Sequence, residues 1–241
     1  MQRGFTLDYY RALGENPQQS LFYVSPLTSV GISLSYAFAT VIIALLLGIP
    51  AAWALARLDP RHNRLARWLN NSMDPLLMLP LGTSAVTLGL GFVVAFSHPP
   101  LDLRASILLI PLAHTLVAFP FVVRSLTPAV RSVLPRLRSA AALLGASPLQ
   151  VLRYIDLPLI GPAFLVAATF AFTISLGEFG ATALLYRPEY PTVPVAIYRY
   201  LGRPGGMNYG QALALSTILM VVCLVGMLTI ERFRVGEVGE F

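Results

Sequence analysis

The stretch 27–56, LTSVGISLSYAFATVIIALLLGIPAAWALA, decides the fold class because it holds no charged residue over 30 positions. A helix needs about 20 apolar residues to cross the hydrocarbon core of a bilayer, so this stretch is long enough to cross at a tilt. In lipid the backbone must satisfy its hydrogen bonds within the segment, which favours a helix. The stretch therefore predicts a transmembrane helix.

The composition extends this prediction to the whole chain. The 241 residues are 56% hydrophobic and 12% charged, with a mean hydropathy of +0.70, whereas soluble domains carry about 25% charged residues. This excludes a soluble enzyme, a nucleic-acid-binding domain and a disordered chain, and predicts an all-α membrane protein. Four further apolar stretches complete a five-span helical bundle: 75–96, 105–123, 157–177 (continuing past Glu178 to about Leu185) and 211–230.

The charged residues predict how the bundle is oriented. All 17 basic residues are arginine, and the lack of lysine excludes a Walker A phosphate loop and a Schiff-base lysine. Eleven arginines lie in alternate segments that include the loop 124–156, against six in the others. Arginine accumulates on the cytoplasmic side of membrane proteins. We therefore expect an extracytoplasmic segment 1–26 without a cleavable signal peptide, a transmembrane domain 27–235 with a cytoplasmic loop 124–156, and a cytoplasmic tail 236–241.

The loop 124–156, RSLTPAVRSVLPRLRSAAALLGASPLQVLRYID, carries the most specific signals. Thr127-Pro128 and Ser147-Pro148 each combine a helix N-cap with proline at the first helical position. Gly145 lies between the two helical patterns and can adopt the positive φ that ends a helix. The loop is therefore expected to form two short helices joined by a glycine turn. An ordinary amphipathic connector is the alternative on these residues alone.

The spacing of residues in this loop resembles the cytoplasmic loop of ABC importer permeases. That motif is Glu-Ala-Ala, three residues, Gly, nine residues, Ile, one residue, Leu-Pro; here Ser139 replaces the leading glutamate, and the other positions keep their spacing. The stretches 175–182, SLGEFGAT, and 192–198, TVPVAIY, are similar to permeases for iron(III), thiamine, sulfate and molybdate, most of all to the iron(III)/thiamine group. The resemblance covers roughly residues 25–235.

This resemblance implies a type I importer permease subunit, or half-permease, in a bacterial inner membrane. Such a protein is not an enzyme, performs no covalent chemistry and needs no cofactor or metal. The implied partners are cytoplasmic ATPase subunits, a second permease half (identical, paralogous or from the same gene), an external substrate-binding protein and the lipid bilayer, with no nucleic acid. Iron(III) or thiamine is the expected cargo. The residues expected to couple the loop to the ATPase are Ser139, Ala140, Ala141, Gly145, Leu149, Leu152, Ile155, Leu157 and Pro158.

Two groups within the predicted spans can ionise. Glu178, flanked by Gly177 and Gly180, either lines a translocation path or accepts hydrogen bonds from another helix. His114 has no second metal ligand at helical spacing, so we expect a hydrogen-bonded core residue. The segment 187–208, with a short helix at 193–201, is expected to be a dock for a substrate-binding protein, an outer loop anchored by tyrosines, or both.

A gradient-driven secondary transporter or channel without an ATPase is the alternative function. Coupling to an ion gradient requires ionisable groups inside the membrane, and the spans offer little beyond Glu178 and His114. A membrane enzyme is a weaker possibility, because no catalytic constellation occurs at a credible spacing.

Overall fold

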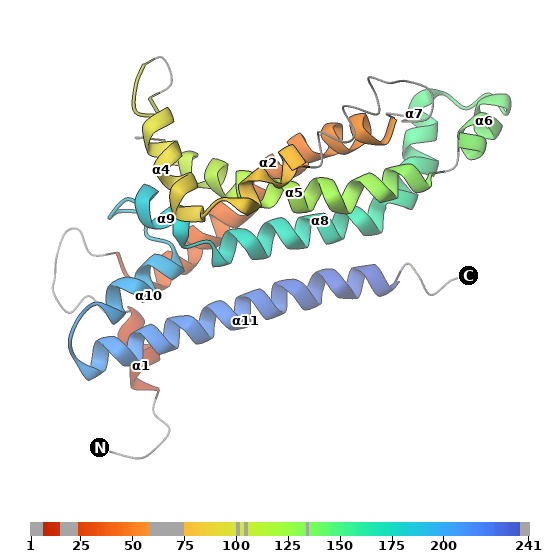
Figure 1. Ribbon diagram of the computed structural model, residues 1–241. Helices are drawn as coiled ribbons and strands as arrows, with labels where there is room; N and C mark the ends of the chain where they lie inside the picture. Colours follow the sequence, from red (N-terminus) through yellow and green to blue (C-terminus); the bar gives the residue numbers. More distant parts are fainter. Residues whose placement is uncertain are drawn as a thin grey trace.

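The computed structural model describes residues 7–14, 24–57, 75–99, 102–103, 106–133 and 135–236, and their regular structure is entirely helical. Long helices run back and forth along one axis, with the shorter helices at the two ends (Figure 1). In chain order the helices are α1 (Asp8–Arg11), η1 (Ala12–Gly14), α2 (Pro26–Arg57), Pro75–Gly82, α4 (Ala85–Ala95), α5 (Leu109–Ser132), α6 (Pro135–Leu143), α7 (Pro148–Val151), a π-helical turn η2 (Leu152–Asp156), α8 (Leu157–Gly177), α9 (Gly180–Leu185), α10 (Val193–Leu201) and α11 (Gly206–Gly236).

Four of these helices are long and apolar enough to cross a membrane: α2, α5, the continuous run through α7 and α8, and α11. A fifth span is formed if Pro75–Gly82 and α4 count together, although the two are bent by 101° at the break between them. The prediction of an all-α membrane bundle is confirmed, and the second predicted span is a sharply broken one.

Alanines hold the centre of the bundle together. The helices α2, α5 and α8 pack against one another, and Ala44, Ala118, Ala167 and Ala171 at their contacts are fully buried. Lipid supplies no hydrophobic drive between helices, so close approach through small side chains favours their association. Some large side chains of the same helices, such as Leu126, are buried beside these alanines, whereas others, such as Leu46, are exposed and available to lipid or to a partner.

Two predicted boundaries were wrong. The third span does not end at Val123, because α5 continues through Thr127 and Pro128 to Ser132. Thr127 caps no new helix: its hydroxyl donates to the carbonyl oxygen of Val123 at 2.7 Å, a bond made within a helix. The fourth span ends at Gly177 as predicted but does not continue to Leu185, because the backbone of Glu178 is extended and α9 starts afresh.

Opposite ends of the bundle carry different structures. The helices α6 and α7 lie at the same end as the C-terminal part of α11, whereas α4, α9, α10 and α1 lie at the other end (Figure 1). The segment 124–156 and the end of α11 therefore share a side, as the orientation from arginine placement requires. Of the four arginines expected in a cytoplasmic loop at 57–67, only Arg57 lies within the described residues, and the sidedness stays a prediction.

His114 joins four helices where α8 breaks. Its Nδ1 and Nε2 atoms lie 2.8 Å from the hydroxyl of Ser175 and 2.7 Å from that of Thr182. Ser175 in turn donates to the hydroxyl of Thr40 on α2 at 3.1 Å. The side chain of His114 is 1% exposed, and both of its nitrogens have a partner. The prediction of a hydrogen-bonded core histidine is confirmed, and this polar network fixes the position of α9 relative to α2, α5 and α8.

Candidate functional site

The first helix of the loop after α5, which is α6, ends in a specific turn at Gly145. The N–H of Gly145 donates to the carbonyl of Ala142 at 3.0 Å, and the N–H of Ala146 to that of Ala141 at 2.9 Å. This pair of bonds is a Schellman motif, which needs a residue with positive φ at the position of Gly145. Its φ is 83°. The predicted glycine turn is confirmed, and it fixes the direction in which the chain leaves α6.

The second helix of the loop starts with a capping box. The Ser147 hydroxyl accepts the N–H of Gln150, and the Gln150 side-chain oxygen accepts the N–H of Ser147 at 2.7 Å. Pro148 occupies the first turn, where its missing N–H needs no partner. These bonds stabilise a helix of only four residues, so the prediction of two short helices separated by a turn is confirmed. Their starting points are Pro135 and Pro148.

An ion pair closes the loop onto the membrane helix. Arg138 on α6 donates from Nε to the Asp156 carboxylate at 2.9 Å, and the two side chains are 31% and 8% exposed. Asp156 ends the π-helical turn that leads directly into α8, and such turns recur at functional sites and bends. A short, directional contact therefore joins α6 to the start of α8.

The same loop exposes large apolar side chains to solvent. Leu143 and Leu144 are 89% and 88% exposed at the end of α6, and Leu149 and Tyr154 are 73% and 70% exposed further along. We call these four residues the exposed loop patch. Exposed apolar side chains of this size, held on a capped and rigid backbone, are typical of a surface that another protein covers.

The residues predicted to couple the loop to a partner fall into two groups. Those that face outward are Ser139, Ala140, Gly145, Leu149, Leu152, Leu157 and Pro158, all exposed. Ala141 is half-buried, and Ile155 is half-buried against the alanine-rich core. Sequence reasoning missed Leu143, Leu144 and Tyr154, together with the ion pair of Arg138 and Asp156. The sequence did offer one signal for Leu143 and Leu144: the two leucines directly precede the glycine that ends the helix.

The second predicted site lies at the break between α8 and α9. One carboxylate oxygen of Glu178 accepts the N–H of Ala181 at 3.0 Å, so the side chain caps the start of α9. Gly180 faces α4 closely, since a Cβ added to it would lie 2.8 Å from that of Ala85. Gly177 is exposed, with open space around it. Glu178 and Gly180 thus have structural contacts here, and their place on a translocation path stays a prediction.

Within the ranges that the structure describes, no group of three His, Cys, Asp or Glu side chains is arranged to hold a metal ion. The fold offers several apolar spans, a capped loop with an exposed apolar surface, and an ion pair from that loop to a span. Together these features define a multi-span membrane protein with an apolar surface on the loop at one end of its bundle.

Comparison with known proteins identifies the group to which this protein belongs. Residues 48–235 match the family described as the binding-protein-dependent transport system inner membrane component. The putative 2-aminoethylphosphonate transport system permease protein PhnV of Salmonella typhimurium is 31% identical over 85% of this chain and 74% of its own length. The molybdenum transport system permease protein ModB of Mycobacterium tuberculosis is 34% identical over 81% of this chain and 75% of its own.

A solved structure matches the fold as well. The inward-facing MetNI methionine ABC transporter has a chain that superposes with a TM-score of 0.65 at 18% identity, covering 88% of this chain and 95% of that one. The chain therefore belongs to the binding-protein-dependent transport system inner membrane component family. It is a permease subunit of an ABC importer, a transport protein rather than an enzyme, as the sequence predicted. The narrower prediction, membership of the iron(III)/thiamine group, is not confirmed.

Proposed function

We propose that this chain is one permease half of an ATP-driven importer and that the loop from Pro135 to Pro158 docks onto a cytoplasmic ATPase subunit. The observation that carries the proposal is the exposed loop patch, held by the Gly145 turn and the Ser147 capping box at one end of the bundle. Burying a leucine side chain completely contributes about 1.5–3 kcal/mol. Covering Leu143 and Leu144 alone is therefore enough to stabilise a specific contact.

The connection from this loop to α8 supports a mechanical role. The chain passes from α7 through the π-helical turn into α8 without an intervening loop, and Arg138 braces α6 against Asp156. A bundle with two arrangements can be biased by a partner that binds one of them better. In the proposed cycle, closure of the ATPase moves the docked loop, α8 follows, and access to the path switches between the two sides of the membrane.

A second permease half completes the proposed transporter. One chain offers one docking loop, whereas an ATPase that closes around nucleotide offers two subunits. Exposed apolar side chains along the spans, among them Phe38, Leu46 and Leu90, leave ample surface for a partner half as well as for lipid. The partner is an identical chain, a paralogous chain or another part of the same gene product, in a bacterial inner membrane.

We further propose that the cargo is a small oxyanion or phosphonate. The relatives are named for 2-aminoethylphosphonate, molybdenum and, at 26% identity over 88% of this chain, sulfate in Anthoceros angustus. None of these names supports the expected iron(III) or thiamine. An external substrate-binding protein would deliver the cargo and supply most of the selectivity, as the family description suggests.

The alternative, a gradient-driven transporter, is less well supported by the same structure. It requires an ionisable group in the membrane that is available to exchange an ion. His114 has hydrogen-bond partners on both ring nitrogens, and Glu178 caps α9. Both groups are engaged in holding helices together.

Affinity purification of the tagged chain from membranes of its host tests the proposal. The wild type should recover an ATPase subunit, and Leu143→Ala combined with Leu144→Ala should reduce that recovery about tenfold, because each truncation removes part of an apolar contact. Gly145→Trp should act similarly. The matched control combines Leu224→Ala with Leu228→Ala, two leucines of the span α11, outside the loop, that are 54% and 57% exposed.

Either of two results would overturn the proposal. If crosslinked wild-type preparations contain no ATPase, the loop is a connector and the gradient-driven transporter becomes the leading function. If the double loop variant recovers as much ATPase as the α11 control, docking takes place elsewhere. Fluorescence-detected size-exclusion profiles of all variants establish that each one folds before the recoveries are compared.

A further inference from the structure

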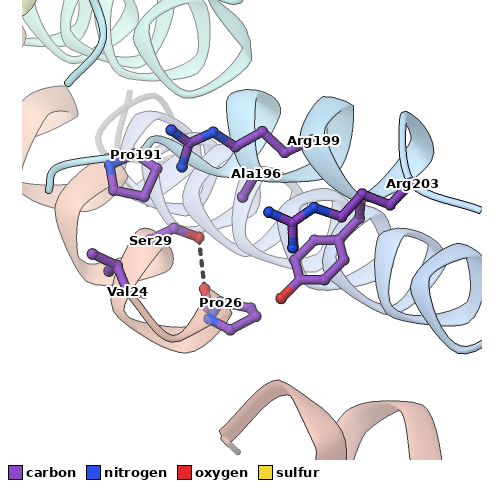
Figure 2. Close-up of a pocket in the computed structure, with 8 residues that line it drawn as sticks. Val24, Pro26, Ser29, Pro191, Ala196, Arg199 and Arg203 are labelled. Atoms are coloured by element: carbon purple, nitrogen blue, oxygen red, sulfur yellow. Dashed lines mark hydrogen bonds between the residues drawn. The ribbon is translucent and has the colours of Figure 1, made fainter. Parts of the chain in front are cut away.

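A small pocket lies at the end of the bundle opposite the docking loop. It is formed where α10 and the turn after it pack near the first turn of α2, and its volume is about 70 Å³. Arg199 and Arg203 extend from the α10 side, while Pro26, Ser29 and Pro191 form the facing wall (Figure 2). Five of its lining residues lie in the segment 187–208, and the pocket takes no part in the proposed docking of the ATPase.

The two arginines make the pocket strongly cationic. Arg199 lies in the last turn of α10 and Arg203 two residues after the helix ends, and both side chains line the pocket. The guanidinium carbon of Arg199 lies 4.6 Å from the ring centroid of Tyr186, a cation–π contact that holds the side chain in place. Among the described residues, no carboxylate lies within ion-pair distance of Arg199 or Arg203, and Glu189 nearby in the sequence is exposed.

The polar groups of the opposite wall do not neutralise this charge. The Ser29 hydroxyl is fully buried and donates to the carbonyl oxygen of Pro26 at 2.6 Å, so its proton is already committed (Figure 2). Two guanidinium groups lining one partly enclosed pocket repel each other and favour an anion between them. Arginine pairs suit carboxylates because several N–H donors can reach both oxygens.

The size of the pocket restricts the anion. A single water needs at least about 10–15 Å³ of such space, so a volume of about 70 Å³ accommodates a carboxylate group with one or two waters. Exposed tyrosines lie nearby in the chain, Tyr198 on α10 at 65% and Tyr209 in the first turn of α11 at 58%. Arginine and tyrosine are the residues enriched at the energetic centres of protein interfaces. This composition favours a carboxylate carried on a protein surface.

We propose that the pocket of Arg199 and Arg203 anchors an aspartate or glutamate side chain of the substrate-binding protein. This rests on the proposed function, in which a binding protein delivers cargo at this end of the bundle. The contact would give the docked complex a fixed register and a salt-dependent association, since charge pairs at the rim of an interface act mainly on encounter and orientation.

Binding measurements on the whole transporter test this proposal. The permease with its ATPase is placed in nanodiscs, and the probe is the binding protein recovered by crosslinking to the wild type. Arg199→Gln combined with Arg203→Gln should weaken binding about tenfold at low salt, with a smaller loss at high salt. The matched control is Arg232→Gln, an exposed arginine at the other end of α11, which should bind like the wild type.

A charge exchange identifies the partner group. Arg203→Glu should abolish most of the binding, and replacing one acidic residue of the binding protein with arginine should restore it. Unchanged binding in the double glutamine variant, with the ATPase still recovered, would overturn the pocket proposal and leave the proposed function intact. Loss of bound anionic lipid from that variant, measured by native mass spectrometry with unchanged protein binding, would also overturn it and assign the pocket to a lipid phosphate. Absence of both ATPase and binding protein from the wild type would instead refute the proposed function.

Discussion

Replacing Gly89 with alanine should push α4 away from α9 and destabilise the protein. A Cβ added to Gly89 would lie 2.9 Å from both the Cα and the carbonyl oxygen of Ala181. These are backbone atoms of a fully buried residue, so no side-chain rotation can relieve the contact. The two helices would have to separate by several tenths of an ångström. Overpacking of this kind typically costs about 1–3 kcal/mol.

Gly91 provides a matched control on the same helix. A Cβ added there meets nothing within 4 Å. Both substitutions gain the helical preference of alanine over glycine, about 1 kcal/mol, so the difference between them isolates the contact with α9. At about 2–4 °C per kcal/mol for a chain of this size, a cost of about 1–3 kcal/mol should make Gly89→Ala melt about 2–12 °C below Gly91→Ala.

Thermal unfolding of the purified variants in the same detergent measures this difference. Equal melting temperatures for the two variants would refute the reasoning, because they would mean that α4 and α9 are not in close contact. The reciprocal variant Gly180→Ala should behave like Gly89→Ala, since its Cβ would lie 2.8 Å from the Cβ of Ala85.

Three further predictions concern the docking loop. Asp156→Asn removes the charge that pairs with Arg138. In proteoliposomes, uptake per ATP hydrolysed should fall several-fold while ATP hydrolysis persists. Parallel loss of uptake and hydrolysis would count against a coupling role. Gly145→Asn tolerates positive φ, whereas Gly145→Val is strained by about 1–2 kcal/mol, so only the valine variant should recover less ATPase; equal recovery would contradict the requirement for this turn. Ser147→Ala breaks the capping box and should lower the stability of α7 by about 1 kcal/mol. The amide of Gln150 should then exchange its hydrogen roughly fivefold faster. Unchanged exchange would show that the cap is dispensable.

Much of the helical architecture could be predicted because apolar length alone decides which segments cross a bilayer. The uncharged stretch 27–56 corresponds to α2, the predicted start at Leu157 is the start of α8, and the predicted short helix at 193–201 is α10. In each case a local signal, either a long apolar run or a proline in the first turn, coincides with the boundary.

The errors arose where tertiary contacts override local signals. Thr127-Pro128 has the sequence of a helix start, yet α5 continues because Thr127 bonds back to Val123 and the helix packs along α2 and α8. The run after Gly177 is apolar enough to extend a span, yet the polar network around His114 and the cap by Glu178 place α9 separately. Hydropathy cannot distinguish a continuous helix from one broken by such bonds.

The candidate site was only partly predictable for a related reason. Gly145 and Ser147 could be identified because a turn and a cap require particular residue types at fixed spacing. The exposure of Leu143 and Leu144 could not, since the sequence does not tell which leucines the chain itself covers. The pairing of Arg138 with Asp156 depends on how the loop folds back over 18 positions.

The distribution of hydrogen bonds suggests how movement would pass through the bundle. At one end, Arg138 and Asp156 tie the loop to α8; toward the other, His114 ties α5 to α8 and α9. Between them α5 and α8 meet through apolar contacts, in which Ala118, Ala167 and Ala171 are fully buried and Phe121 stacks on Phe170. Apolar contacts resist separation but oppose tilting less than directional bonds do. We therefore expect α8 to carry a displacement of the docking loop along its length to the break before α9, where the extended residue Glu178 allows the direction of movement to change.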